Sequence, residues 1–100
     1  MNWRDMPSMA ALRAFSVFSE TGNLQQAGAQ LNVSHAAISQ QLRQLEAHMG
    51  VPLLDRSGRA LRLTPEGEQL AQALTLGFGA IRMAVQDLTT RGAGQPLHVT

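Results

Sequence analysis

The fold is decided by residues 24–56, LQQAGAQLNVSHAAISQQLRQLEAHMGVPLLDR. Apolar residues recur at helical spacing over about residues 24–31 and again over about residues 35–48. Asn32-Val33 is the expected turn between them, because Asn tolerates the left-handed backbone of a tight corner. Ser34 is the expected N-cap of the second helix. A short helix, a tight turn and a second helix together predict a helix-turn-helix.

The second helix of this motif has one apolar and one polar face. A period near 3.6 predicts that the inward face carries Ala37, Ile38, Leu42, Leu45 and Met49. The other face carries small or hydrogen-bonding side chains and one cation, namely His35, Ala36, Ser39, Gln40 and Arg43. Such a face suits a helix that lies in the major groove of double-stranded DNA.

Each residue of the polar face has a chemistry that suits base readout. Gln40 matches adenine bidentately, and Arg43 is long enough for a guanine or a phosphate. His35 and Ser39 donate or accept at base edges, and Ala36 offers a contact to a thymine methyl. For each residue considered by itself, the alternative is that it lies on a solvent-exposed helix face and contacts no base.

The first helix of the motif carries two further expectations. Gly28 costs roughly 1 kcal/mol against Ala inside a helix, so a close crossing with the next helix is expected. Thr21, Gln25 and Gln26 lie near the start of this helix, which crosses the DNA backbone in helix-turn-helix proteins, and one of them is expected to contact a phosphate. Val33 is expected to fill the corner between the two helices.

An amphipathic helix is predicted before the motif, over about residues 9–20. Ser8 is its expected N-cap and Gly22 its expected C-terminal cap. The single tryptophan, Trp3, precedes this helix and is expected to pack against it.

A two-stranded wing is predicted after the motif. Residues 53–56 and 60–63 are strand candidates, with residues 57–59 as the turn between them. Arg59 at the tip is suited to a narrow minor groove, which attracts arginine. Arg62 is expected to contact the DNA backbone. The alternative is that it is an ordinary solvent-facing strand residue.

A long helix is predicted over residues 65–91. Thr64 is its expected N-cap, and Pro65 suits the first helical position. A short heptad seam runs along it, consisting of Leu70, Leu74, Gly77, Ile81, Ala84 and Leu88. This seam is covered either by the chain's own domain or by a second chain. Pairing with a second chain is preferred, because such an apolar patch is unusual on a monomer.

The chain divides into three parts on these patterns. Residues 1–64 form the winged helix-turn-helix, residues 65–91 the linker or dimerisation helix, and residues 92–100 a hinge with the start of a further strand. A lone strand is not stable, which suggests that the chain is cut from a longer protein. A free-standing short regulator is the alternative.

The composition of the chain limits the kinds of protein that it can be. The chain of 100 residues has 44% hydrophobic residues, which supports one small domain with a core. It has no cysteine, which excludes disulfides and thiolate metal sites and fits a reducing cytoplasm. No apolar run approaches the ~18 residues of a membrane span, and the N-terminus does not read as a signal peptide. The net charge is only +1, but six of the eight arginines lie within residues 1–65.

The sequence favours a non-enzymatic protein. His35, His48 and His98 lack metal-ligand spacing, and Glu66 and Glu68 point to different faces of one helix. Neither a nucleophile elbow nor a phosphate-binding glycine loop is present. The stronger alternative to DNA binding is a winged helix used only for protein–protein contact. Its expected sign is an apolar or acidic face on the second helix of the motif.

The chain closely resembles the N-terminal region of LysR-type transcriptional regulators, over nearly its whole length. The motifs that carry the resemblance are Asn23-Leu24-Gln25-Gln26-Ala27-Gly28, Val33-Ser34, Ile38-Ser39-Gln40-Gln41-Leu42, Leu45-Glu46, Gly50-Val51-Pro52-Leu53-Leu54-Asp55-Arg56 and Leu63-Thr64-Pro65-Glu66-Gly67. The combination is very specific, although no single piece is.

The resemblance implies a mainly α fold: a winged helix-turn-helix of three helices and a two-stranded wing, followed by a long linker helix that dimerises antiparallel. It implies a homodimer on an inverted-repeat DNA site, a tetramer in the full-length protein, and a further C-terminal domain that binds a small-molecule effector. No cofactor is implied for this part of the chain.

The resemblance also assigns DNA contacts. Arg56 stands where the family keeps an arginine that contacts the DNA backbone, with a salt bridge to Asp55 or Glu46 as the alternative. Ser34 is expected both to cap its helix and to contact a phosphate. His35, Ala36 and Gln40 depart from the family's common residues, which affects the expected target sequence and not the mode of binding.

Overall fold

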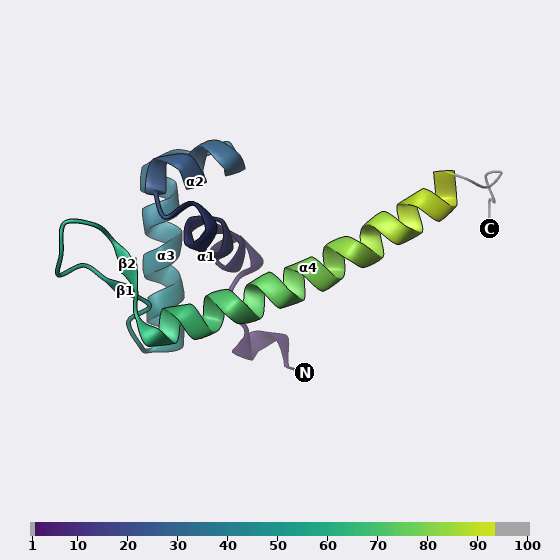
Figure 1. The fold of residues 1–100 in the computed structure, drawn as a ribbon. Coiled ribbons are helices and arrows are strands. Elements are labelled where there is room, and N and C mark those ends of the chain that lie inside the picture. The colour runs from purple at the N-terminus through teal and green to yellow at the C-terminus, as the bar shows by residue number, and fades with distance from the viewer. Residues whose placement is uncertain (1, 94–100) are drawn as a thin grey trace.

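The computed structural model describes residues 2–93 and consists mainly of helices (Figure 1). The elements are η1 (Trp3–Asp5), α1 (Met9–Thr21), α2 (Leu24–Leu31), α3 (His35–Met49), β1 (Leu54–Asp55), β2 (Arg62–Leu63) and α4 (Pro65–Ala93). The winged helix-turn-helix with a long fourth helix is therefore confirmed. The strand predicted over residues 97–100 lies outside the described residues.

Helices α1, α2 and α3 enclose the core, to which the base of the wing adds the side chains of Leu53 and Leu54. The largest fully buried side chains are Phe15, Phe18, Ile38, Leu42, Leu45 and Leu53. Met49, which was predicted to face inward, is 39% exposed because it lies in the last turn of α3, beyond the helices that cover its neighbours.

Side chains and left-handed residues set the ends of the helices. Ser8 caps α1 as predicted, since its Oγ accepts a hydrogen bond of 3.1 Å from the Ala11 N–H. Gly22 and Asn32 end α1 and α2 with φ of 68° and 59°, the left-handed backbone expected of these residue types. Asn23 is the N-cap of α2, since its Oδ1 accepts a hydrogen bond of 3.0 Å from the Gln26 N–H.

The tight corner between α2 and α3 explains Gly28. A Cβ at this position would lie 2.6 Å from the Val33 carbonyl oxygen and 3.3 Å from the His35 nitrogen. The close neighbour is thus the backbone of the turn and not the body of the next helix. Val33 does not fill the corner with its side chain, which is 46% exposed, because its backbone already occupies that space.

The wing has two strands, as predicted; they pair antiparallel and have two residues each. Leu54 pairs with Leu63, and Asp55 pairs with Arg62. Residues 56–61 form a longer loop than the predicted turn at residues 57–59. The ladder is closed at its base by the Thr64 N–H, which donates to the Leu53 carbonyl at 3.0 Å.

Helix α4 begins against the domain and then leaves it (Figure 1). Leu70, Ala71, Leu74 and Phe78 pack on the core from the first half of the helix. From residue 80 to residue 92 every residue is exposed. The helix extends to Ala93, so Gly92 and Ala93 belong to α4 and not to the predicted hinge.

Trp3 does not pack as expected. It lies in η1, a separate short helix, and is 70% exposed. The described N-terminal segment lies instead near the last turn of α3, where the His48 Nε2 is 3.1 Å from the Asp5 carbonyl oxygen.

Gly67 in the first turns of α4 provides a test of this packing. A Cβ there would collide with the Leu53 backbone carbonyl, whereas a Cβ on Gly79 would meet nothing within 4 Å. We expect Gly67→Ala to lower the free energy of unfolding by about 1–3 kcal/mol. Gly79→Ala in the same helix should raise it by about 0.5–1 kcal/mol. Denaturant unfolding followed by circular dichroism measures both, and a gain in both variants would contradict the described packing.

Candidate nucleic-acid interface

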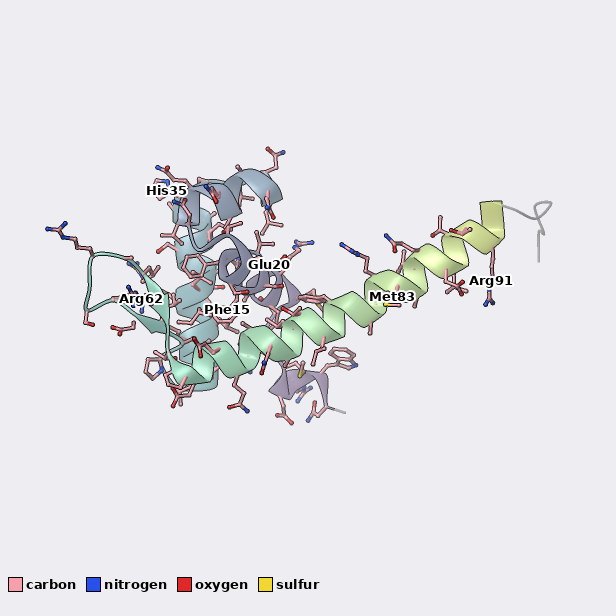
Figure 2. The ribbon with its side chains drawn as sticks, in the orientation of Figure 1. Phe15, Glu20, His35, Arg62, Met83 and Arg91 are labelled. Atoms are coloured by element: carbon pink, nitrogen blue, oxygen red, sulfur yellow. The ribbon has the colours of Figure 1, made fainter. Side chains whose placement is uncertain are left out.

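The polar side chains predicted to read bases lie on the surface of α3. His35, Ala36, Gln40 and Arg43 are exposed, and Ser39 is half-buried at the edge of the face. Figure 2 shows His35 at the beginning of α3, beside α2. The buried Ile38, Leu42 and Leu45 hold the opposite side of the helix in the core, so the rotation of α3 about its axis keeps the polar face outward.

The beginning of α3 is organised for close approach by another molecule. Ser34 caps it as predicted, since its Oγ accepts from the Ala37 N–H at 3.1 Å. The preceding turn is held by the Val33 N–H, which donates to the Gly28 carbonyl at 2.8 Å. The first turn of α3 is the positive end of the helix dipole, which favours an anion such as a phosphate.

Of the three residues predicted to lie near the start of α2 and contact a phosphate, two belong to α2 and one belongs to α1. Gln25 and Gln26 are exposed in the first turn of α2. Thr21 is instead the last residue of α1, and its Oγ1 donates to the Val17 carbonyl at 3.0 Å. The hydroxyl hydrogen is already used within α1, so the expected phosphate contact by Thr21 is not supported.

The wing lies next to the beginnings of α2 and α3. These three segments border one hollow of about 400 Å³, lined by Phe18, Gly22, Asn23, Leu24, Gln25, His35, Ala60 and Leu61. Residues more than 20 positions apart in the sequence therefore form one continuous surface. The tertiary fold, and not the local sequence, places the wing loop beside the beginning of α3.

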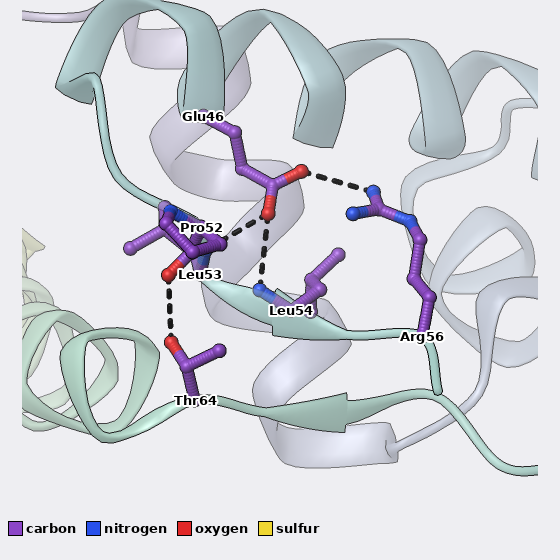
Figure 3. A network of polar contacts seen from close by, with 6 residues as sticks. All are labelled: Glu46, Pro52, Leu53, Leu54, Arg56 and Thr64. Atoms are coloured by element: carbon purple, nitrogen blue, oxygen red, sulfur yellow. Dashed lines mark hydrogen bonds and ion pairs between the residues drawn. The ribbon is translucent and has the colours of Figure 1, made fainter. Parts of the chain in front are cut away.

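The base of the wing is joined to α3 through one carboxylate (Figure 3). The Glu46 Oε2 accepts hydrogen bonds from the backbone N–H groups of Leu53 at 2.8 Å and Leu54 at 3.1 Å. Its Oε1 accepts from an Arg56 guanidinium nitrogen at 2.9 Å. The salt bridge that was the alternative for Arg56 is thus present, with Glu46 as the partner.

This environment changes the titration of Glu46. Burial favours the neutral acid, but the hydrogen bonds from Arg56, Leu53 and Leu54, together with the Arg56 charge, outweigh it and hold the pKa of Glu46 below its ordinary value. The carboxylate is therefore more stable in the folded protein than in the unfolded chain.

The other two wing arginines differ from Arg56. Arg62 lies opposite Asp55 in the ladder, and its positive charge makes a small contribution to lowering the Asp55 pKa, behind the hydrogen bonds from Ser57. Figure 2 marks Arg62 on the wing. Arg59 is exposed in the wing loop. Within residues 2–93 the salt bridges are Arg56–Glu46 and Arg91–Asp87, so Arg43, Arg59 and Arg62 keep their charges available to a partner.

Neither a metal site nor a membrane segment is found in the described part of the chain. No group of three or more His, Asp or Glu side chains in residues 2–93 could hold a metal ion. No helix there combines the length and the apolar character that crossing a membrane requires.

The sequence profile that the chain matches is described as bacterial regulatory helix-turn-helix protein, lysR family, and the match covers residues 9–68. Among curated proteins, the chain is 47% identical over 100 residues to the AhcY transcriptional activator HvrB of Rhodobacter capsulatus. It is 37% identical over 93 residues to the HTH-type transcriptional regulator TrpI of Pseudomonas aeruginosa. The chain spans about a third of the length of these relatives, 34% and 32% respectively.

Solved structures of similar fold include a DNA complex. The BenM_DBD/catB site 1 DNA complex matches with a TM-score of 0.76 and 27% identity, over 89% of this chain and 98% of that one. These matches, together with the geometry of α3 and the wing, agree with the expected family resemblance.

The Glu46 network predicts a dependence of stability on acid. Because the folded-state pKa of Glu46 is lowered, its contribution to stability is present at neutral pH. That contribution is lost as the pH falls through and below the ordinary pKa of a glutamate. We expect the free energy of unfolding of Glu46→Gln to fall less steeply than that of the wild type over this range. Urea titrations at a series of pH values measure it.

The exposed carboxylate of Glu20, outside this network, supplies the control for that measurement. Glu20→Gln removes a carboxylate outside the network and is measured in the same urea titrations. Equal slopes in all three proteins would show that Glu46 is not stabilised as a carboxylate by the fold.

Proposed function

This chain belongs to the lysR family of bacterial regulatory helix-turn-helix proteins, and we propose that it binds double-stranded DNA sequence-specifically as the DNA-binding part of a transcriptional regulator. The observation that carries the proposal is the polar face of α3. Four of its five residues are exposed, it carries Arg43 without a carboxylate partner in the described chain, and the wing loop lies beside its beginning at His35. Its fold is also that of a BenM domain solved on DNA.

In this proposal α3 lies in the major groove. His35, Ala36, Ser39, Gln40 and Arg43 face the base edges, with the bidentate match of Gln40 to adenine as the most specific contact. Ser34, Gln25 and Gln26 lie where α2 and α3 begin and contact the phosphates. Arg56 and Arg62 contact the backbone from the wing, and Arg59 approaches the minor groove.

We also propose that two chains pair through α4. The apolar seam is divided by the structure: Leu70 and Leu74 pack on the chain's own core, while Ile81 and Leu88 are 57% and 63% exposed. Val85, 55% exposed, continues the stripe that Leu74 and Phe78 begin, because the four residues Leu74, Phe78, Ile81 and Val85 follow at helical spacing. Gly77 and Ala84 are exposed at the edge of this stripe. An uncovered apolar stripe on a helix that has left its domain is suited to a second copy.

Pairing of two chains sets the architecture of the site on DNA. Two symmetry-related α3 helices would meet an inverted repeat in successive major grooves. For the whole protein we propose a tetramer in the cytoplasm, with a small-molecule effector bound by a C-terminal domain. No observation favours the alternative of a winged helix for protein contact alone, since the α3 face is neither apolar nor acidic over residues 35–43.

Gln40 provides the test of sequence-specific binding. With a site selected from a random duplex library, wild-type affinity should fall steeply with salt, because each neutralised phosphate contributes a slope of about 0.9. Gln40→Ala should lose about 1–3 kcal/mol on that site, keep the salt slope, and keep its affinity for unrelated duplexes. Fluorescence anisotropy titrations measure all three. A flat salt dependence of the wild type would contradict DNA binding, and an equal loss on all duplexes would contradict base reading by Gln40.

Val85 provides the test of pairing through α4. Val85→Glu places a charge on the exposed stripe and should shift the protein to monomer at micromolar concentration, without loss of the fold, because Val85 does not belong to the core. Met83 is 70% exposed on a different side of the same helix, so Met83→Glu should leave the dimer intact. Sedimentation equilibrium compares the two. A monomeric wild type, or equal effects of both variants, would refute pairing through this stripe.

A further inference from the structure

Glu46 occupies an unexpected place for an acid in a DNA-binding surface. Ser39, Arg43 and Glu46 follow one another by four and three residues on α3, so they lie on one stripe of the helix. The stripe belongs to the polar face. Helix α3 carries no acid from His35 up to Glu46. An acid at this point would by itself repel phosphates, so its presence needs a physical explanation.

The contacts of Glu46 supply part of that reason. One oxygen, Oε2, accepts both backbone N–H groups of the incoming strand, from Leu53 and Leu54. The other oxygen, Oε1, is left for Arg56 alone. The Glu46 side chain is 14% exposed while that of Arg56 is 46% exposed, so the acid is covered and the guanidinium faces outward. The negative charge is thereby buried beneath the positive one.

Arg56 keeps most of its hydrogen-bonding capacity in this arrangement. A guanidinium carries five N–H donors, and the structure uses one nitrogen of Arg56, on Glu46. Figure 3 shows the guanidinium at the end of an extended side chain, reached by Glu46 from α3. The long side chain is therefore fixed before any partner arrives, so less rotational freedom is lost when it binds an anion.

We propose that Glu46 is a positioning residue for DNA binding, which holds the Arg56 guanidinium at the end of the polar stripe of α3 with its unused N–H groups available to a phosphate. The inference rests on the proposed function, since it concerns how the same surface binds DNA. It assigns to Glu46 a favourable effect on binding, although its own charge is of the wrong sign.

Glu46→Gln separates positioning from anchoring of the wing. The amide oxygen of Gln can still accept from the Leu53 and Leu54 N–H groups, which holds β1 in place. This orientation turns the amide NH₂ toward Arg56, where two donors face each other and the bond of 2.9 Å cannot form. The variant therefore releases Arg56 and also removes a negative charge.

The two effects of this substitution on DNA binding have opposite signs. If Glu46 acted on DNA only through its charge, Glu46→Gln would tighten binding, because one repulsive group is removed. If Glu46 positions Arg56, the variant weakens binding and lowers the salt slope. The sign of the change therefore decides the question.

A four-protein cycle of wild type, Glu46→Gln, Arg56→Gln and the double variant tests the proposal on one selected duplex over a range of salt. We expect Arg56→Gln to weaken binding about tenfold and to lower the salt slope by about 0.9, the value of one phosphate contact. Glu46→Gln should weaken binding about three- to tenfold and lower the slope in the same direction. In the Arg56→Gln background, Glu46→Gln should leave affinity and slope unchanged or tighten binding slightly.

Each contrary result has a definite meaning. Tighter binding by Glu46→Gln alone, or an equal loss with and without Arg56, would overturn the positioning role. Wild-type protein that does not bind duplex DNA would overturn the proposed function itself, before the cycle begins. Circular dichroism and thermal unfolding of all four proteins verify that a loss of binding is not a loss of fold.

A second measurement needs only the wild-type chain. The side-chain Nε–H order parameter of Arg56 should approach that of rigid backbone, about 0.85, while that of the exposed Arg59 should lie below about 0.6. Arg59 is the matched control, because it lies in the same wing without a carboxylate partner in the described chain. Equal mobility of the two side chains would overturn the positioning of Arg56.

Discussion

The burial of one stripe of α3 is the constraint on which the rest of the structure depends. Ile38, Leu42 and Leu45 are almost fully buried against Phe15 and Phe18 of α1. Shortening a side chain at such a position costs about 2–5 kcal/mol, so the helix cannot rotate about its axis without loss of the core. Because the stripe is fixed, the opposite side of α3 is presented outward as a rigid surface. A surface that recognises base edges needs this rigidity.

Two polar residues extend that constraint to the remainder of the domain. Glu46 joins α3 to the backbone of β1 and to Arg56. Thr64 connects the chain before β1 to the beginning of α4. Its N–H donates to the Leu53 carbonyl and its hydroxyl donates to the Pro52 carbonyl (Figure 3). The same hydroxyl oxygen accepts from the Gly67 N–H in α4. The polar face of α3, the wing and α4 are therefore placed relative to one another by a few short contacts, and pairing of α4 would fix the distance between two such faces.

Much of the fold and part of the candidate site could be predicted from the sequence, because the signals are local. Caps such as Ser8 and Ser34 act within three residues, and the period of α3 follows from its own apolar side chains. The family membership rests on combinations of such local motifs. Thr21 belongs to the last turn of α1 and not to the beginning of α2, because its hydroxyl donates to the Val17 carbonyl. Trp3 was predicted wrongly because the described N-terminal segment lies by His48 instead.

By itself, the sequence determined where α1, α2, α3 and α4 begin, which side of α3 is polar, and which residue types lie on that side. Those properties depend on side chains a few positions apart, so the local pattern is sufficient. The tertiary structure alone decided that Glu46 holds Arg56, that the wing loop borders the beginning of α3, and that the α4 stripe is covered up to Phe78 and open beyond it. Each of these depends on where distant segments meet, and that is set by the packing of the whole core.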